Sequence, residues 1–283
     1  MTTVAIDTGV GSLLRGWREQ RRISQLELAL RADSSARHIS FIETGRSRPS
    51  EEMVLRLAEH LDIPVRERNA LLVVAGYAPR YAQTPLDDPA LGPVREALER
   101  LLQGYDPYPA FVVDGAYDVV AANRGMRSLL EGVAGHLLEP PLNAMRITLH
   151  PEGLAPRIRN LPEWRADLLA QMRRQLALAR STRLRSLYEE VAAYPAPRCD
   201  DRSGGPGADG SDGVARAGAG SAPSAPFALP LRIEHAGRVL SFIASIATFN
   251  TPMDVTVAEL AIETLLPADR ATAEHLRSLE AAP

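Results

Sequence analysis

Residues 24–45 read Ser-Gln-Leu-Glu-Leu-Ala-Leu-Arg-Ala-Asp-Ser-Ser-Ala-Arg-His-Ile-Ser-Phe-Ile-Glu-Thr-Gly and decide the fold of the first part of the chain. Ser24 and Ser35 each precede a short run of apolar residues at helical spacing. A serine in that position accepts a hydrogen bond from an amide of the first turn. Glu27, three residues after Ser24, completes a capping box in which its side chain reaches back. The segment therefore predicts two short helices joined by a tight turn at Asp33.

The same signals continue on both sides of this segment. A helical pattern precedes it, and Ser50 with two following glutamates predicts a further helix, because acids suit the positive end of a helix. Pro64 suits the first turn of another helix, and Gly76 suits its end. We therefore expect a small all-α domain of five short helices over residues 11–76.

The second helix of the quoted segment has two contrasting sides. At 100° per residue, Ile39 and Ile42 face the core of the domain. The opposite side is small, polar, cationic and aromatic, which suits the major groove of DNA. Arg37 can donate two hydrogen bonds to guanine, and Ala36 and Phe41 can contact thymine methyl groups. The predicted DNA-contacting residues are Gln25, Ser35, Ala36, Arg37, Ser40, Phe41, Thr44, Arg46 and Arg48.

Some of these residues have specific expected roles and specific alternatives. Gln25 opens its helix, where amides and the side-chain amide can clamp a phosphate. Arg46 and Arg48 follow the other helix and can neutralise backbone charge, although the alternative is a solvated turn. Phe41 has the alternative of packing against the fourth helix instead of contacting a base.

The charge of the chain is unevenly distributed. Residues 11–50 hold eight Arg and four acids, whereas residues 81–283 hold 20 Arg and 25 acids. This asymmetry favours a nucleic-acid module near the N-terminus. The chain has no lysine, which excludes Schiff-base, P-loop and kinase chemistry. Its single cysteine, Cys199, excludes an intramolecular disulfide framework. No apolar run of membrane-spanning length and no secretory signal are found, so a cytoplasmic location is expected.

The period of the pattern changes after a Pro-punctuated connector with one helix near 94–103. Residues 110–114 and 117–122 predict a β-hairpin, and helical segments follow over 124–130, 142–149, from 162 and over 184–194. Strands return at 229–234, 239–248 and 259–266, and a last helix covers 269–279. We expect a single antiparallel sheet of about five strands with helices on one side. Residues 199–226 are nearly all Gly, Ala, Ser, Asp and Pro and predict a disordered insertion.

The apolar residues of the second part predict a pocket between the concave face of the sheet and the covering helices. The candidates for contact with a ligand are Phe111, Val113, Val120, Met126, Leu130, Trp164, Leu168, Met172, Phe242, Ala244 and Ile246, with packing in an ordinary core as the alternative. If the ligand has a carboxylate, Arg146 or Arg173 at the rim can meet it. The six histidines show no paired metal-ligand spacing and no nucleophile motif is present, so no catalytic residue, metal or cofactor is expected.

The Ser-Gln…Ala…Ser…Ile-Ser-x-Ile-Glu-x-Gly skeleton resembles the helix-turn-helix of the XRE (Cro/C1-type repressor) family. The resemblance implies a buried ion pair between Arg18 and Glu43. Longer stretches resemble the regulators called MmyB-like, whose C-terminal half is a PAS-like ligand-binding domain. These stretches are 35–50, 66–72, 75–79, 110–114, 121–123, 248–256 and 267–269.

We expect four regions: a disordered tail 1–10, a helix-turn-helix domain 11–79, a connector 80–104 and a PAS-like domain 105–280. The resemblance implies a regulator that binds double-stranded DNA. Because one domain covers only a few base pairs, we expect a homodimer on a palindromic operator. The PAS-like domain would sense a small apolar or amphipathic, fatty-acid-like ligand. The alternatives are a protein-interaction module without a small ligand and an enzyme with a DNA-binding appendage, which would need a polar cluster in the second domain.

Overall fold

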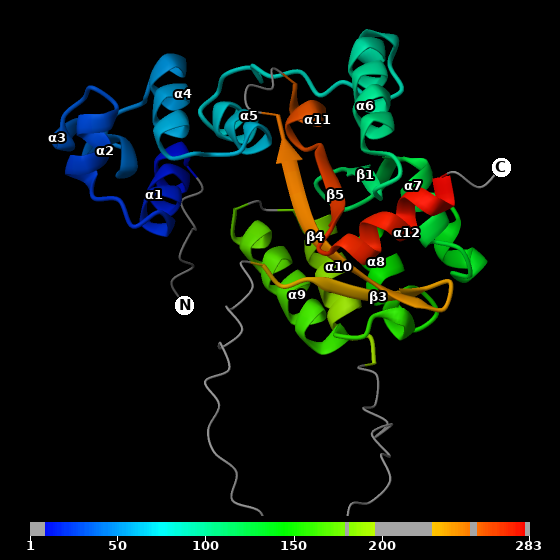
Figure 1. Ribbon diagram of the computed structural model, residues 1–283. Helices are drawn as coiled ribbons and strands as arrows, with labels where there is room; N and C mark the ends of the chain where they lie inside the picture. Colours follow the sequence, from blue (N-terminus) through cyan, green and yellow to red (C-terminus); the bar gives the residue numbers. More distant parts are fainter. Residues whose placement is uncertain (1–8, 179–180, 196–227, 250–253, 281–283) are drawn as a thin grey trace, which may run out of the picture.

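The computed structural model describes residues 9–178, 181–195, 228–249 and 254–280. In these residues, a group of five helices is followed by a five-stranded antiparallel sheet flanked by helices (Figure 1). The predicted fold class is confirmed. The predicted insertion 199–226, with Cys199, lies outside the described residues, as does nearly all of the predicted tail 1–10. None of the helices in the described ranges is long and apolar enough to cross a membrane.

The helical group follows the capping signals of the sequence. Its helices are α1 (Val10–Gln20), α2 (Gln25–Arg31), α3 (Ala36–Glu43), α4 (Glu51–His60) and α5 (Val65–Val74). Ser24, Ser35 and Ser50 accept hydrogen bonds from the third amides of α2, α3 and α4 at 3.1, 3.1 and 3.2 Å. The second half of the expected capping box is absent, because the Glu27 carboxylate accepts from Arg31 one turn later.

The core of the helical group is closely packed. Leu14, Leu28, Ile39, Leu57 and Leu72 are among its fully buried side chains. α1 and α3 approach so closely that a Cβ on Gly11 would lie 2.1 Å from the carbonyl oxygen of Ile42. The position of α3 is therefore fixed by backbone contact as well as by side chains.

The sheet has the strand order β2-β1-β5-β4-β3, and every neighbouring pair is antiparallel. Its strands are β1 (Ala110–Val113), β2 (Val119–Ala122), β3 (Leu231–His235), β4 (Arg238–Thr248) and β5 (Ala261–Pro267). β5 is the central strand, so its side chains lie in the middle of both faces. A short helix, α11 (Val255–Ala258), leads into it and packs against α5.

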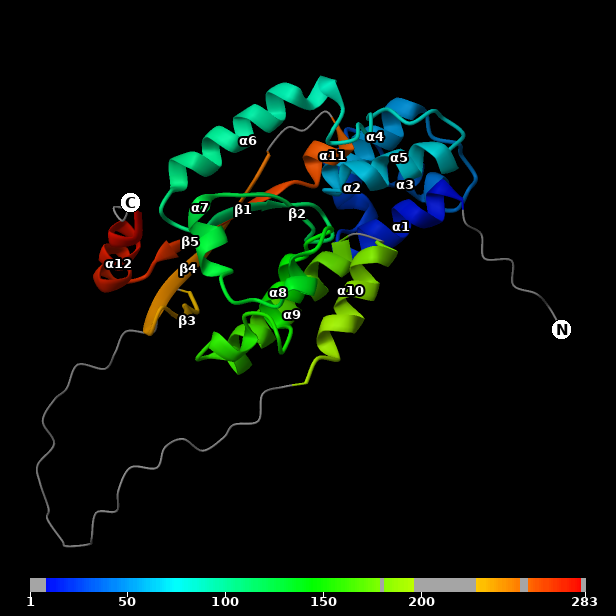
Figure 2. The ribbon, with the colours of Figure 1, turned by 90° about the vertical axis from the view of Figure 1, so that its right-hand side faces the viewer.

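The two faces of the sheet carry different helices (Figure 2). The inner face, marked by Phe111, Phe242 and Leu265, shares its core with α7 (Arg124–Leu129), α8 (Ala144–Leu149), α9 (Leu161–Leu178) and α10 (Thr182–Ala192). The outer face, marked by Ala110 and Val112, packs against α6 (Gly92–Tyr105). The sequence analysis expected helices on one side of the sheet. In the structure, the connector helix α6 covers the other face as well. The remaining elements are α12 (Arg270–Glu280) and the 3-10 helices η1 (Pro89–Leu91), η2 (Gly135–Leu138) and η3 (Ala155–Arg157).

Candidate DNA interface and ligand cavity

The predicted recognition helix α3 is anchored on one side and open on the other. Ile39, Ile42 and Glu43 are buried, whereas Arg37 and Thr44 are exposed. Ser35 is exposed at the N-cap, and Ala36, Ser40 and Phe41 are partly exposed. In Figure 1, α3 lies at the side of the helical group that faces away from the sheet. The helix thus presents a free face of the composition that the sequence predicted.

An ion pair ties this helix to α1. Arg18 Nε donates to Glu43 Oε1 at 2.6 Å and Arg18 Nη2 donates to Glu43 Oε2 at 2.9 Å, and both residues are buried. Arg18 Nη1 also donates to the carbonyl of Ile23 at 2.9 Å. The hydrogen bonds with Glu43 raise the pKa of Arg18, so its guanidinium stays charged in this buried position. The buried pair implied by the family resemblance is therefore present in the structure.

Two of the predicted DNA-contacting residues also make contacts within the protein. Gln25 Nε2 donates to Glu43 Oε2 at 2.8 Å, so this amide adds a third hydrogen bond to the buried ion pair. Arg48 Nη2 donates to the carbonyl of Ala75 at 2.9 Å, and its guanidinium lies over the Tyr77 ring. Both contacts join segments that are distant in the chain, so the sequence pattern did not reveal them.

Phe41 forms a small cationic–aromatic surface with its neighbours. The guanidinium carbons of Arg37 and Arg46 lie 5.2 and 5.9 Å from the centre of the Phe41 ring. Contacts of this kind orient the arginine side chains without consuming their hydrogen-bond donors. Arg37 and Arg46 therefore remain available for bases and phosphates.

A cavity of about 330 Å3 lies between the inner face of the sheet and helices α8 and α9. This volume falls at the lower end of the usual range for small-molecule sites. Its wall is mostly apolar. The lining includes six of the predicted ligand-contacting residues, which are Phe111, Met126, Trp164, Leu168, Ala244 and Ile246.

The other five predicted contacts lie elsewhere. Val113, Met172 and Phe242 are buried in the core behind the cavity, and Leu130 packs against that core from α7's end. The prediction that Val120 faces the cavity is wrong, because Val120 packs on the outer face with the residues that contact α6. The hairpin turn extends through Tyr117, whose φ is 63°, and the β1–β2 register shifts between Val112 and Val113. This shift places Val119 instead of Val120 on the inner face.

The polar part of the cavity wall was missed by the sequence analysis. Thr148, Asp167, Gln171 and Glu263 line it beside the apolar residues. Glu263 lies on β5 between Phe111 of β1 and Ile246 of β4. Burial among these groups raises the pKa of Glu263 to about 7. The one signal in the sequence for this residue is that Glu263 alternates with apolar residues along its strand.

The arginines proposed for a ligand carboxylate do not line this cavity. Arg146 forms two hydrogen bonds with the Glu190 carboxylate, at 2.8 and 2.7 Å. Arg173 is exposed on α9. The structure therefore does not support the expectation of a basic rim.

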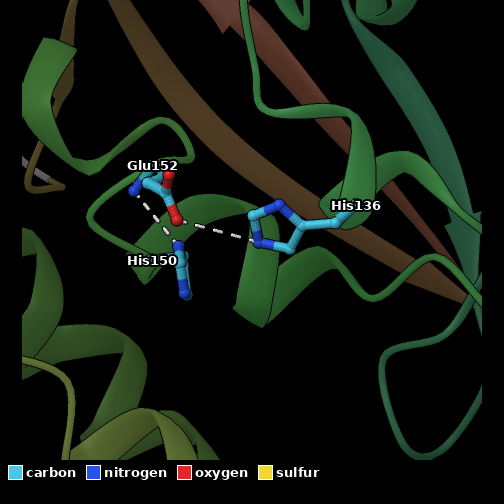
Figure 3. Close-up of side chains that lie close together, drawn as sticks. All are labelled: His136, His150 and Glu152. Carbon is cyan, nitrogen blue, oxygen red and sulfur yellow. Dashed lines mark hydrogen bonds and ion pairs between the residues drawn. The ribbon is translucent and has the colours of Figure 1, made fainter.

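Two histidines and a glutamate come together outside the cavity (Figure 3). The possible ligand atoms of His136, His150 and Glu152 lie within 4.8 Å of one another. These residue types suit zinc. However, His150 Nδ1 already accepts a hydrogen bond from the Glu152 amide at 3.1 Å, so this atom is not free in the present arrangement. Sequence spacing did not reveal the cluster, because folding brings residues 136 and 150 together.

Both walls of the cavity are connected to the helical group. α11 leads into β5, and Glu259 between them accepts two hydrogen bonds from Arg66 of α5, at 2.6 and 2.8 Å. Gln20 of α1 donates to the carbonyl of Ala177 near the end of α9. These contacts connect the cavity to the domain that carries α3.

Comparison with known proteins agrees with this architecture. Residues 94–279 match the family model of the MmyB-like transcription regulator ligand binding domain, and residues 14–68 match a helix-turn-helix model. A helix-turn-helix joined to such a domain defines a DNA-binding transcription regulator. The chain belongs to the MmyB-like transcription regulators.

Solved structures give weaker likenesses. The clp gene regulator ClgR from Corynebacterium glutamicum is 26% identical, covers 35% of this chain and 90% of its own, and has a TM-score of 0.21. An RNA-binding light-oxygen-voltage receptor is 14% identical, with a TM-score of 0.29, over 98% of this chain and 64% of its own. Both TM-scores are too low to define the fold of this chain. No curated protein matches it.

Proposed function

We propose that this regulator acts in the cytoplasm as a homodimer whose affinity for a palindromic operator changes when a small, mostly apolar molecule occupies the cavity. The observation that carries the proposal is the cavity of about 330 Å3 whose two walls, β5 and α9, both connect to the helical group. A concave, mostly apolar space of this kind favours a small ligand over a protein partner, which would need an exposed apolar patch.

The DNA contact rests on α3. Arg37 is exposed and donates no side-chain hydrogen bond to another described residue, which suits a bidentate contact to guanine. Arg46 lies beside it at the end of the helix, where a phosphate contact is expected. One helix-turn-helix covers only a few base pairs, so two copies on a palindrome supply the required specificity.

The coupling between cavity and DNA uses the contact between Arg66 and Glu259. A ligand that shifts β5 moves α11, and the charged pair transmits this movement to α5, which packs against α1. Such a ligand changes DNA affinity only through its different affinities for the two conformers, and these effects are typically about 1–3 kcal/mol.

The test measures ligand retention and coupling separately. Native mass spectrometry of protein purified from cells identifies any retained molecule, and selection from random duplexes supplies the operator. Fluorescence anisotropy then gives operator affinity with and without that molecule. We expect a change of about 5- to 150-fold.

Arg66→Gln should bind the molecule normally but lose most of this change. Arg270→Gln, which removes an exposed pair with Glu274 inside α12, is the matched control and should retain the change. Equal operator affinities of the occupied and empty wild-type protein would leave a cavity without a regulatory role.

A further inference from the structure

Glu263 stands at the centre of the inner face of the sheet. β5 is the middle strand, and Glu263 pairs across it with Phe111 on one side and Ile246 on the other. Both of these neighbours line the cavity together with Glu263. The accessible surface that this side chain retains therefore faces the cavity.

No partner for this carboxylate is found among the described residues. The charge of Glu263 acts on Tyr117, whose hydroxyl accepts a hydrogen bond from Gln171 Nε2 at 3.2 Å. Across the cavity, α9 supplies Asp167 and Gln171, and α8 supplies Thr148. The described lining thus contains two acidic side chains and neither arginine nor histidine.

A carboxylate in this position costs free energy because it is largely removed from water and has no cationic partner among the described residues. A ligand with a positively charged hydrogen-bond donor would supply the partner, whereas a ligand carboxylate would add a like charge to the site. The apolar remainder of the wall would hold the rest of the ligand.

We propose that the cavity binds an apolar molecule carrying a protonated amine, and that Glu263 pairs with this amine. The inference rests on the proposed ligand-binding function and names the chemical class of the ligand. It replaces the expectation of a fatty-acid-like carboxylate.

The pH dependence of binding has a defined sign. Burial raises the pKa of Glu263 to about 7, so the empty site is partly protonated at neutral pH. The ammonium pairs with the ionised carboxylate, and amine affinity should therefore rise between pH 6 and pH 8. The other titratable groups facing Glu263 are Tyr117 from the hairpin turn and Asp167 from α9, and Arg174 acts on Tyr117 from α9. β1 and β4 contribute Phe111, Ala244 and Ile246, whose side chains have no ionisable group.

The experiment compares three probes of equal chain length, octylamine, octanol and octanoate, on the full-length chain. Trp164 in the cavity wall gives a fluorescence signal, and calorimetry gives the affinity. We expect octylamine to bind at least about tenfold more tightly than octanol, and octanoate to bind most weakly. Glu263→Gln, of nearly the same size, should abolish the amine preference and its pH dependence but retain octanol binding, which also verifies the fold.

Glu274→Gln is the matched control, because it removes an exposed carboxylate of α12 that does not line the cavity and should preserve the preference. If octanol binds but octylamine has no advantage, or Glu263→Gln retains the full advantage, the inference is wrong and the proposed function stands. If none of the three probes binds the wild-type cavity, both fail.

Discussion

Removing Arg18 should destabilise the helical domain far more than removing any exposed arginine. The Glu43 side chain is only 3% exposed, and Arg18 supplies two of its three hydrogen bonds. Arg18→Met would leave a buried charge with Gln25 alone. Breaking a buried pair in this way costs about 3–5 kcal/mol of unfolding free energy. The double variant Arg18→Met/Glu43→Met should lose less than the single variant, because no unpaired charge remains.

Urea denaturation of the full-length chain measures this effect. Trp17 is 3% exposed in the same core and reports unfolding of the helical domain, while Trp164→Phe in every variant removes the signal of the second domain. Arg31→Met is the control, since its pair with Glu27 is about half exposed and should be worth about 1 kcal/mol or less. A cost for Arg18→Met as small as that of the control would refute the role of the buried pair in fixing α3.

Three further predictions address other parts of the molecule. Arg37→Ala should lose about 1–3 kcal/mol of operator-binding free energy and relax the base preference. Arg46→Ala should weaken the binding of all duplexes alike and reduce the slope of log affinity against log salt concentration by about one. Identical anisotropy profiles for the two variants would contradict this division. Gly11→Ala should lower the unfolding free energy by at least about 1–3 kcal/mol, because its Cβ would meet the carbonyl oxygen of Ile42 at 2.1 Å; an unchanged thermal midpoint would show that α1 can move. Burial raises the pKa of Glu263 from 4.5 to about 7, so ionisation of this carboxyl opposes folding. The unfolding free energy of the wild type should therefore decline between pH 5 and pH 8, relative to that of Glu263→Gln, by up to about 3 kcal/mol. Parallel pH profiles of the two unfolding free energies would exclude this burial.

The helical domain was predictable because its signals are local. Serine caps, apolar spacing and turn residues act within a few positions of each other, and the structure has the five helices at the expected places. The free face of α3 followed from the 3.6-residue period alone. The roles of Gln25 and Arg48 did not follow, because their partners Glu43 and Ala75 are 18 and 27 residues away.

The sheet domain was predictable only in part. Alternating apolar residues predicted all five strands, and six of the eleven predicted contacts line the cavity. Val120 was misplaced because a shift of one residue in register moves a side chain to the other face. The sequence could not show that α6 covers the outer face, since its contact with β1 is a tertiary one.

The sequence by itself determined the class of the protein, the helix boundaries of the DNA-binding domain and the residues on the free face of α3. The class followed from the resemblance of its motifs to a known family, whereas the helix boundaries and the free face depend on hydrogen bonds and periodicities within single helices. Only the tertiary structure decided the chemistry of the cavity, because strand register brings Glu263 between Phe111 and Ile246. The same long-range packing paired Arg66 with Glu259. These two residues are 193 positions apart in the sequence, and their contact joins the cavity to the DNA-binding domain.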